Sequence, residues 1–315
     1  MKYIKRRKVA IIGAGNVGAS IAYSLTIQNT ADEIILIDVD YKKAVSEAAD
    51  IRHGIPSEGD VEVYAGDYKD CKDCDLIVIT AGRNRKVGES RLDLISGNTV
   101  ILKNIINQLI KVYTKGVIML VSNPVDILAY QCISQMGLPD GKVFGTGCML
   151  DTSRLARVFA DYVGVSTKDV QINIVGEHGE GQIPIWSRAE IQGMNLKEYC
   201  KKNALILDKQ EKNILTEKVK RMGADIIQGK NVTNYGIATC VSYLANAILN
   251  QYSINAPVST VFQGEYGIAD VSLSIPSVIG GNGVEKRLVD ENWDDEEIEQ
   301  LRKVAEKIKG ILKMI

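Results

Sequence analysis

Residues 8–18 read Lys-Val-Ala-Ile-Ile-Gly-Ala-Gly-Asn-Val-Gly, and this stretch decides the fold. A short apolar, β-branched run, residues 8–12, comes first, which is the pattern of a buried parallel strand. Three glycines follow at the spacing G-x-G-x-x-G, and a helical pattern continues to Ile27. The spacing alone is a weak signal, but a second apolar run, residues 33–38, ends in Asp38, 20 residues after Gly18. The strand, the glycines, the helix and the acid together predict a dinucleotide-binding unit.

The glycines and the acid of this unit have separate physical tasks. Gly13 makes the tight turn, Gly15 lets a pyrophosphate approach the backbone at the helix N-terminus, and Gly18 lets the helix pack closely on the strand. Asp38 can accept hydrogen bonds from the adenosine ribose hydroxyls. A 2′-phosphate would meet Asp38 and Asp40 with no adjacent arginine, so the sequence favours NAD over NADP.

Alternating strand and helix patterns continue to about residue 147, and the pattern then changes. In the first part we expect strands near 61–64, 75–80, 116–121 and 142–144, and helices at 41–53, 91–113 and 125–136. Afterwards we expect helices at 149–163, 208–228, 236–251 and 295–313, with short β-branched runs at 170–175, 258–262 and 270–274. The predicted fold class is α/β: a Rossmann-type doubly wound parallel sheet (1–147) followed by a mixed α/β substrate domain (148–315).

Composition excludes several other classes of protein. The chain has 315 residues, 45% of them hydrophobic, and a net charge of −1, which argues against a nucleic-acid partner. No apolar run approaches the ~18 residues of a membrane span. Six scattered cysteines do not form a disulfide framework, and Cys71-Lys-Asp-Cys74 lacks the second pair of a zinc site. We expect free thiols, no metal site and a cytoplasmic location.

One of only two histidines is the candidate for proton transfer. His178 lies in residues 174–180, Ile-Val-Gly-Glu-His-Gly-Glu, and imidazole titrates near neutral pH. The other, His53, stands next to a glycine at an expected helix end, which is ordinary capping. A lone histidine is more often structural than catalytic, so the case for His178 depends on the segments around it.

Three further segments carry polar side chains at the ends of expected elements. Residues 81–93, Ala-Gly-Arg-Asn-Arg-Lys-Val-Gly-Glu-Ser-Arg-Leu-Asp, follow the fourth strand at the edge where open parallel sheets bind ligands. Residues 122–126, Ser-Asn-Pro-Val-Asp, follow the fifth strand. Residues 150–154, Leu-Asp-Thr-Ser-Arg, place Asp151 and Arg154 on one helix face.

These segments occur in the order found in the L-lactate/L-malate dehydrogenase family, which the chain resembles nearly end to end. The resemblance implies that His178 donates and accepts the proton while Asp151 holds its imidazole. It also implies that Arg154 grips the substrate carboxylate, that Arg91 polarises the carbonyl from a mobile lid, and that Asn123 hydrogen-bonds the substrate. The chemistry asks for these groups independently, because reduction of a 2-keto acid builds negative charge on the carbonyl oxygen.

The resemblance also implies the remaining contacts and the assembly. Substrate is expected to contact Arg85 and Thr233 as well. The expected cofactor is NAD, with contacts from Gly13, Gly15, Asn16, Val17, Gly18, Asp38, Ala81, Gly82, Ser122 and Asn123. Members of the family are dimers or tetramers, and we expect a homotetramer, with a dimer as the alternative.

The choice of hydroxy acid divides the sequence markers. Arg85 is malate-type, because an arginine there pairs with the second carboxylate of oxaloacetate in the family. Glu89, Glu177, residues 145–147 and Thr233 are lactate-type, and Glu89 could pair with Arg85 or oppose a dicarboxylate. The sum favours the L-lactate dehydrogenase reaction of fermentative glycolysis. The alternatives are L-malate or broad L-2-hydroxy acid oxidation and, in another class, a non-catalytic NAD-binding protein.

One departure from the family pattern concerns activation by fructose 1,6-bisphosphate. The arginine and histidine that bind it in many bacterial members correspond to Ala156 and Gln171 here. We therefore expect no activation through that site.

Overall fold

The computed structural model describes residues 6–55, 60–83 and 88–315, with Arg91 described by its backbone alone. Packing divides the chain into two compact units. The first unit holds residues 1–146, 234–255 and 278–286, and the second holds 147–233, 256–277 and 287–315. The segments 234–255 and 278–286 therefore pack with the first unit, although they follow residue 147 in the sequence.

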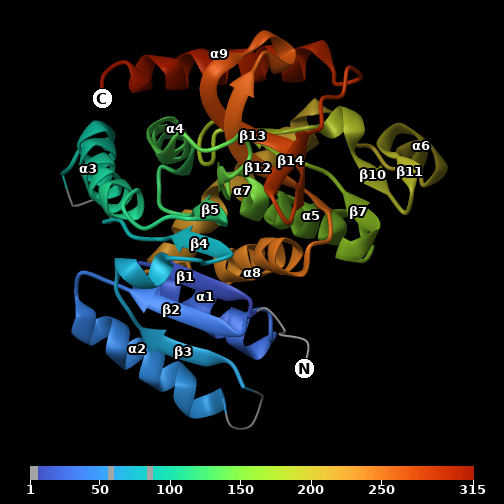
Figure 1. The fold of residues 1–315 in the computed structure, drawn as a ribbon. Helices are drawn as coiled ribbons and strands as arrows, with labels where there is room; N and C mark the ends of the chain where they lie inside the picture. The colour runs from blue at the N-terminus through green and yellow to red at the C-terminus, as the bar shows by residue number, and fades with distance from the viewer. Residues whose placement is uncertain (1–5, 56–59, 84–87) are drawn as a thin grey trace. The chain divides into compact units, whose positions relative to one another are not determined.

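Six parallel strands form the centre of the first unit, in the order β3-β2-β1-β4-β5-β6, and Figure 1 labels β1 to β5. Their pairs are parallel throughout, and nearly every residue of β1, β2, β4 and β5 is buried, as their Val- and Ile-rich sequences predict. This strand order is that of the dinucleotide-binding fold, so the predicted fold class is confirmed. The strands are β1 (Lys8–Ile12), β2 (Glu33–Ile37), β3 (Glu62–Ala65), β4 (Leu76–Ile79), β5 (Val117–Leu120) and β6 (Val143–Gly145).

Five long helices cover this sheet. Side chains of α3 and α4, among them Leu102, Ile106 and Leu128, form one buried cluster with the strands. The hydroxyl of Ser242 on α8 donates a hydrogen bond to that of Ser24 on α1 at 2.8 Å. Helix α2 packs beside β3. The helices are α1 (Asn16–Ile27), α2 (Tyr41–Gly54), α3 (Arg91–Leu109), α4 (Val125–Met136) and α8 (Tyr235–Asn250).

The second unit is mixed, as predicted. Strands β12 (Ile254–Gln263), β13 (Ala269–Gly280), β8 (Ile174–Gly176) and β9 (Gln182–Pro184) neighbour one another in that order and lie mostly in this unit. Strand β14 (Gly283–Arg287), which pairs with β13, belongs to the first unit up to residue 286. A small sheet holds β7 (Val170–Gln171), β10 (Glu190–Ile191) and β11 (Met194–Asn195). The helices are α5 (Met149–Val163), α6 (Leu196–Lys202), α7 (Lys209–Lys230) and α9 (Asp295–Leu312), and Phe159 of α5 meets Trp186 edge-on.

The run 170–175 differs from its expected form as a single strand. It divides into β7 and β8, which belong to different sheets. Between them the carbonyl of Asn173 accepts a hydrogen bond from the N–H of Ile185. The β-branched run is continuous in the sequence, so the sequence did not predict where the strand divides. Pairing with different neighbouring strands decides the position of the division. Among the described residues, no helix is long and apolar enough to cross a membrane.

Candidate functional site

The glycine-rich turn has the geometry of a nucleotide site. Gly13 has φ +110°, and a side-chain carbon there would lie 2.6 Å from the backbone nitrogen of Ala81. At Gly18 such a carbon would lie 1.8 Å from the carbonyl oxygen of Gly13, so only glycine fits either position. Gly15 instead faces open space, with nothing within 4 Å. This is the place where a ligand can approach the backbone closely.

Two further features suit a dinucleotide. Helix α1 begins at Asn16 and Val17 without a side-chain cap from the described residues, which leaves its first N–H groups to bind a phosphate. At the end of β2, Asp38 accepts hydrogen bonds from the N–H of Ala14 at 2.7 Å and from that of Asp40 at 2.9 Å. The carboxylate is therefore held beside the turn. These residues fit NAD.

The segments that follow β4 and β5 lie together at the same edge of the sheet. Ser122 donates its hydroxyl to the carbonyl of Ala81 at 2.6 Å, and the turn at Gly13 meets Ala81 as well. A side-chain carbon at Gly82 would lie 3.5 Å from the amide oxygen of Asn98. The structure thus brings together the predicted cofactor contacts of the first unit.

Sequence reasoning did not single out Asn98, although it organises this edge. Its side chain is on α3 and only 3% exposed, and its Nδ2 donates to the carbonyl of Asn123 at 2.7 Å. The available signal was an amide on the apolar face of a helix, in register with the buried Ile95, Leu102 and Ile105. A buried amide must find hydrogen-bond partners, so that position predicts a polar network.

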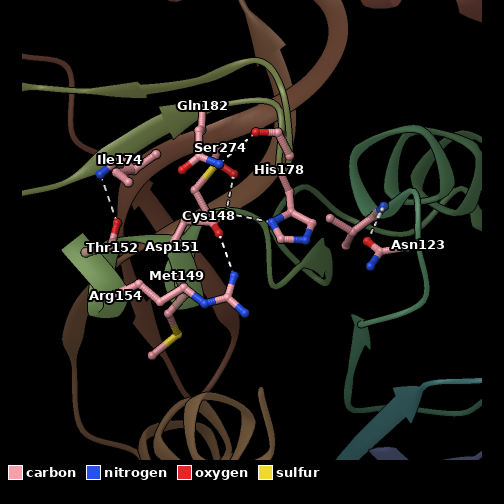
Figure 2. Close-up of polar contacts among 12 residues, drawn as sticks. Asn123, Cys148, Met149, Asp151, Thr152, Arg154, Ile174, His178, Gln182 and Ser274 are labelled. Atoms are coloured by element: carbon pink, nitrogen blue, oxygen red, sulfur yellow. Dashed lines mark hydrogen bonds and ion pairs between the residues drawn. The ribbon is translucent and has the colours of Figure 1, made fainter. Parts of the chain in front are cut away.

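The second unit brings His178 and Asp151 into direct contact (Figure 2). The Nδ1 of His178 lies 2.6 Å from Oδ2 of Asp151, and the Nη1 of Arg154 donates to Oδ1 at 3.1 Å. Asp151 is 1% exposed, whereas the side chains of His178 and Arg154 keep 25% and 13% of their surface exposed. The carboxylate is thus buried between an imidazole and a guanidinium that still reach solvent.

The electrostatics of the group keep Asp151 ionised. Burial by itself would raise the pKa of its carboxyl, but the charge and hydrogen bond of His178, followed by those of Arg154, lower that pKa below its usual value. A carboxylate on Nδ1 leaves Nε2 as the ring nitrogen that can exchange a proton with a ligand. The arrangement can therefore protonate and deprotonate an oxygen while gripping an anion.

Backbone geometry explains why these side chains meet. His178 stands in the β8–β9 turn, between Gly176 with φ +88° and Gly179 with φ +115°. The Nε2 of Gln182 donates to the carbonyl of Gly179 at 2.7 Å and closes this turn. The hydroxyl of Thr152, on α5 beside Asp151, accepts from the N–H of Ile174 at 2.8 Å. Helix α5 is thereby bonded to the strand that leads to His178.

Four further residues predicted at or near the substrate site are Arg85, Arg91, Thr233 and Glu89. Arg85 lies outside the described residues, and Arg91 begins α3 with an undescribed side chain. Thr233 is half-buried in the connection between α7 and α8. Glu89, which the sequence offered as a partner for Arg85, forms an ion pair with Arg83.

The two cysteines of the C-x-x-C sequence are buried core residues. Burial raises the pKa of the Cys71 thiol to about 12, and that of the Cys74 thiol is raised as well. Both are free thiols. Within the described residues no cluster of His, Cys, Asp and Glu could hold a metal ion.

Comparison with known proteins places these residues in a context. Residues 7–145 match the sequence model of the lactate/malate dehydrogenase NAD-binding domain, and residues 148–315 match that of its alpha/beta C-terminal domain. The L-lactate dehydrogenase of Acetivibrio thermocellus is 40% identical over 98% of this chain and 97% of that protein. The L-lactate dehydrogenase of Thermoanaerobacterium saccharolyticum is 41% identical over 98% of this chain and 99% of that protein. The solved minor L-lactate dehydrogenase from Enterococcus mundtii, in its ligands-bound form, superposes with a TM-score of 0.94 at 36% identity, covering 98% of each chain.

Proposed function

Because the chain belongs to the lactate/malate dehydrogenase family, we propose that it is an NAD-dependent L-lactate dehydrogenase, which reduces pyruvate with NADH to L-lactate and NAD. The observation that carries this proposal is the buried Asp151 carboxylate, 2.6 Å from His178 and 3.1 Å from Arg154. A proton carrier and a carboxylate-binding cation are the two groups that a 2-keto acid requires.

The residues of the second unit divide the work on the substrate. Protonated His178 gives its Nε2 proton to the carbonyl oxygen as that oxygen becomes an alkoxide. Asp151 stabilises the imidazolium beforehand and fixes the orientation of the ring. Arg154 binds the substrate carboxylate through guanidinium nitrogens other than the Nη1 that faces Asp151. In the oxidation of lactate, neutral His178 takes the proton back.

The residues of the first unit hold the cofactor and complete the substrate contacts. NAD, when bound, exchanges a hydride with the substrate carbon. Gly13, Gly15 and the N-terminus of α1 receive its pyrophosphate, and Asp38 binds the adenosine ribose. For Asn123 we propose a hydrogen bond to the substrate. Further proposed contacts are Arg91 to the carbonyl, Arg85 and Thr233 to the rest of the substrate, and Asn16, Val17, Ala81, Gly82 and Ser122 to NAD.

The assembly proposed is a homotetramer, with a dimer as the alternative, at work in cytoplasmic fermentation. A groove of about 540 Å³ between α1, α2 and α8 has exposed apolar residues along it, including Tyr23, Ile27 and Tyr235. Exposed apolar patches of this kind mark protein interfaces. Light scattering on the purified protein should give four times the mass of one chain, and a single-chain mass would refute the assembly.

The activity is tested by measuring kcat/KM with NADH for pyruvate and oxaloacetate in parallel. We expect kcat/KM for pyruvate to exceed that for oxaloacetate by about a hundredfold, because most of the sequence markers are lactate-type. A single charged contact is strong enough to reverse a preference of this size. Oxaloacetate in the lead would instead assign the malate reaction and make Arg85 decisive. His178→Ala should abolish nearly all turnover and keep NADH binding. Turnover equal to that of the wild type would refute the assignment of His178.

A further inference from the structure

Arg83 follows Gly82 after β4, and both its backbone N–H and its backbone carbonyl are hydrogen-bonded to the side chain of Asn98. Its N–H donates to Oδ1 of Asn98 at 2.9 Å, and its carbonyl accepts from Nδ2 of Asn98 at 3.3 Å. One side chain on α3 therefore satisfies both backbone groups of Arg83, as a neighbouring strand would. Because Asn98 is buried, water competes poorly for these bonds.

The guanidinium of Arg83 reaches in turn to the first turn of α3. Its Nη1 donates to Oε2 of Glu89 at 2.7 Å, and its Nη2 contacts the other carboxylate oxygen. Nη2 also donates to the carbonyl of Asp93 at 3.0 Å. Paired contacts between a guanidinium and a carboxylate are stronger and more directional than single ones. Arg83 thus ties the chain before position 84 to the chain after position 88.

Gly97 gives an independent sign that this contact is built in. Glycine is unfavourable inside a helix, and Gly97 lies in the middle of α3. A side-chain carbon at Gly97 would lie 2.5 Å from Nη2 of Arg83 and 2.6 Å from its Nε. The guanidinium therefore occupies the space that any larger residue would fill.

The same network extends to the segment after β5. Nδ2 of Asn98, besides its bond to Arg83, donates to the carbonyl of Asn123 at 2.7 Å. Asn123 is the proposed substrate contact of this segment, and Arg91 stands in the turn of α3 that Arg83 contacts. Asn98 and Arg83 thus connect the backbone positions of two proposed substrate-binding residues.

We propose that Arg83, seated on Gly97 and held by Asn98, is a positioning residue for substrate binding. It fixes the first turn of α3 and the Asn123 segment before substrate arrives. With Arg83 bonded to Glu89 and to the carbonyl of Asp93, the start of α3 is already ordered, so less ordering remains to be done on binding. The proposal rests on the proposed function and names a determinant of its substrate affinity.

The most informative test is Gly97→Ala, because it should stabilise helix α3 while weakening substrate binding. Alanine favours the helix and should keep or raise Tm. It also displaces the flexible end of Arg83, and we expect KM for pyruvate to rise about tenfold, with kcat within about twofold and the Kd for NADH unchanged. Arg83→Met should raise KM equally. Gly310→Ala, at a helical glycine with nothing within 4 Å, is the matched control and should leave kinetics unchanged.

Hydrogen exchange supplies a readout that does not need activity. Amides of residues 88–94 should exchange faster in Gly97→Ala and Arg83→Met than in the wild type. An unchanged KM in both variants, or unchanged exchange, would overturn the positioning role. A wild-type protein that reduces neither keto acid would refute the proposed function instead. Faster exchange in the variants would then still show that the hydrogen bonds of Arg83 and Asn98 order the start of α3.

Discussion

Two aspartates with lowered pKa values, one in each unit, reach that state by different routes. Asp32, before β2, is held by Arg7 through its backbone N–H at 2.7 Å and its Nη2 at 2.8 Å. The hydrogen bond from the Arg7 side chain is the largest cause of its lowered pKa, and the side chain remains 35% exposed. For Asp151 the largest influence is burial, which acts in the opposite direction and is outweighed by His178 and Arg154.

This difference in burial distinguishes an ion pair that only stabilises the fold, Asp32 with Arg7, from the group that takes part in the proposed proton transfer, Asp151 with His178 and Arg154. Solvent screens the charge of Asp32, so the ion pair with Arg7 contributes little to the free energy of unfolding. Its main effect is to fix the chain before β1. Asp151 has lost its water and depends on its two partners for compensation. A buried carboxylate that needs cationic partners binds the protonated imidazole more strongly than the neutral one. Burial against His178 and Arg154, rather than the direction of the pKa shift, therefore distinguishes Asp151 from Asp32.

The largest effect that would sharpen this contrast is expected for Asp151→Asn. The amide keeps the shape but cannot stabilise an imidazolium, so kcat for pyruvate reduction should fall by on the order of a thousandfold. Asp161→Asn is the matched control on the same helix, where the exposed Asp161 pairs only with Arg157 among its described contacts. Steady-state kinetics with NADH measure both. A loss below about tenfold for Asp151→Asn would end the distinction between the two aspartates.

A smaller effect is expected at the surface pair. Asp32→Asn should reduce the free energy of unfolding by about 0.5 kcal/mol at pH 7, after allowance for screening by solvent. Because the folded pKa of Asp32 is lowered, its stabilisation is present above the ordinary aspartate pKa of about 4 and is lost as pH falls through the folded value. Urea unfolding of both proteins between pH 7 and pH 3 should show the difference shrinking with acid. A difference that grew on acidification would contradict this assignment.

Much of the nucleotide half followed from local sequence. The bounds of β1 and α4 agree with their predicted ranges, because apolar runs, glycines and proline act over a few residues. The turn at Gly13 and Gly18 likewise depends on backbone sterics that any chain of this sequence would meet. The two-residue strands β10 and β11 were missed, since so short a segment has no periodicity of its own.

The sequence by itself determined the alternation of strands and helices, the glycine turn with Asp38, and the residue types that keto-acid chemistry needs, because each is encoded within a few neighbouring positions. Tertiary structure alone decided that Asp151 is buried against His178, 27 residues away, and that Glu89 meets Arg83 above Gly97. Desolvation and ion pairing depend on which distant segments exclude water together. No local pattern in the chain records that.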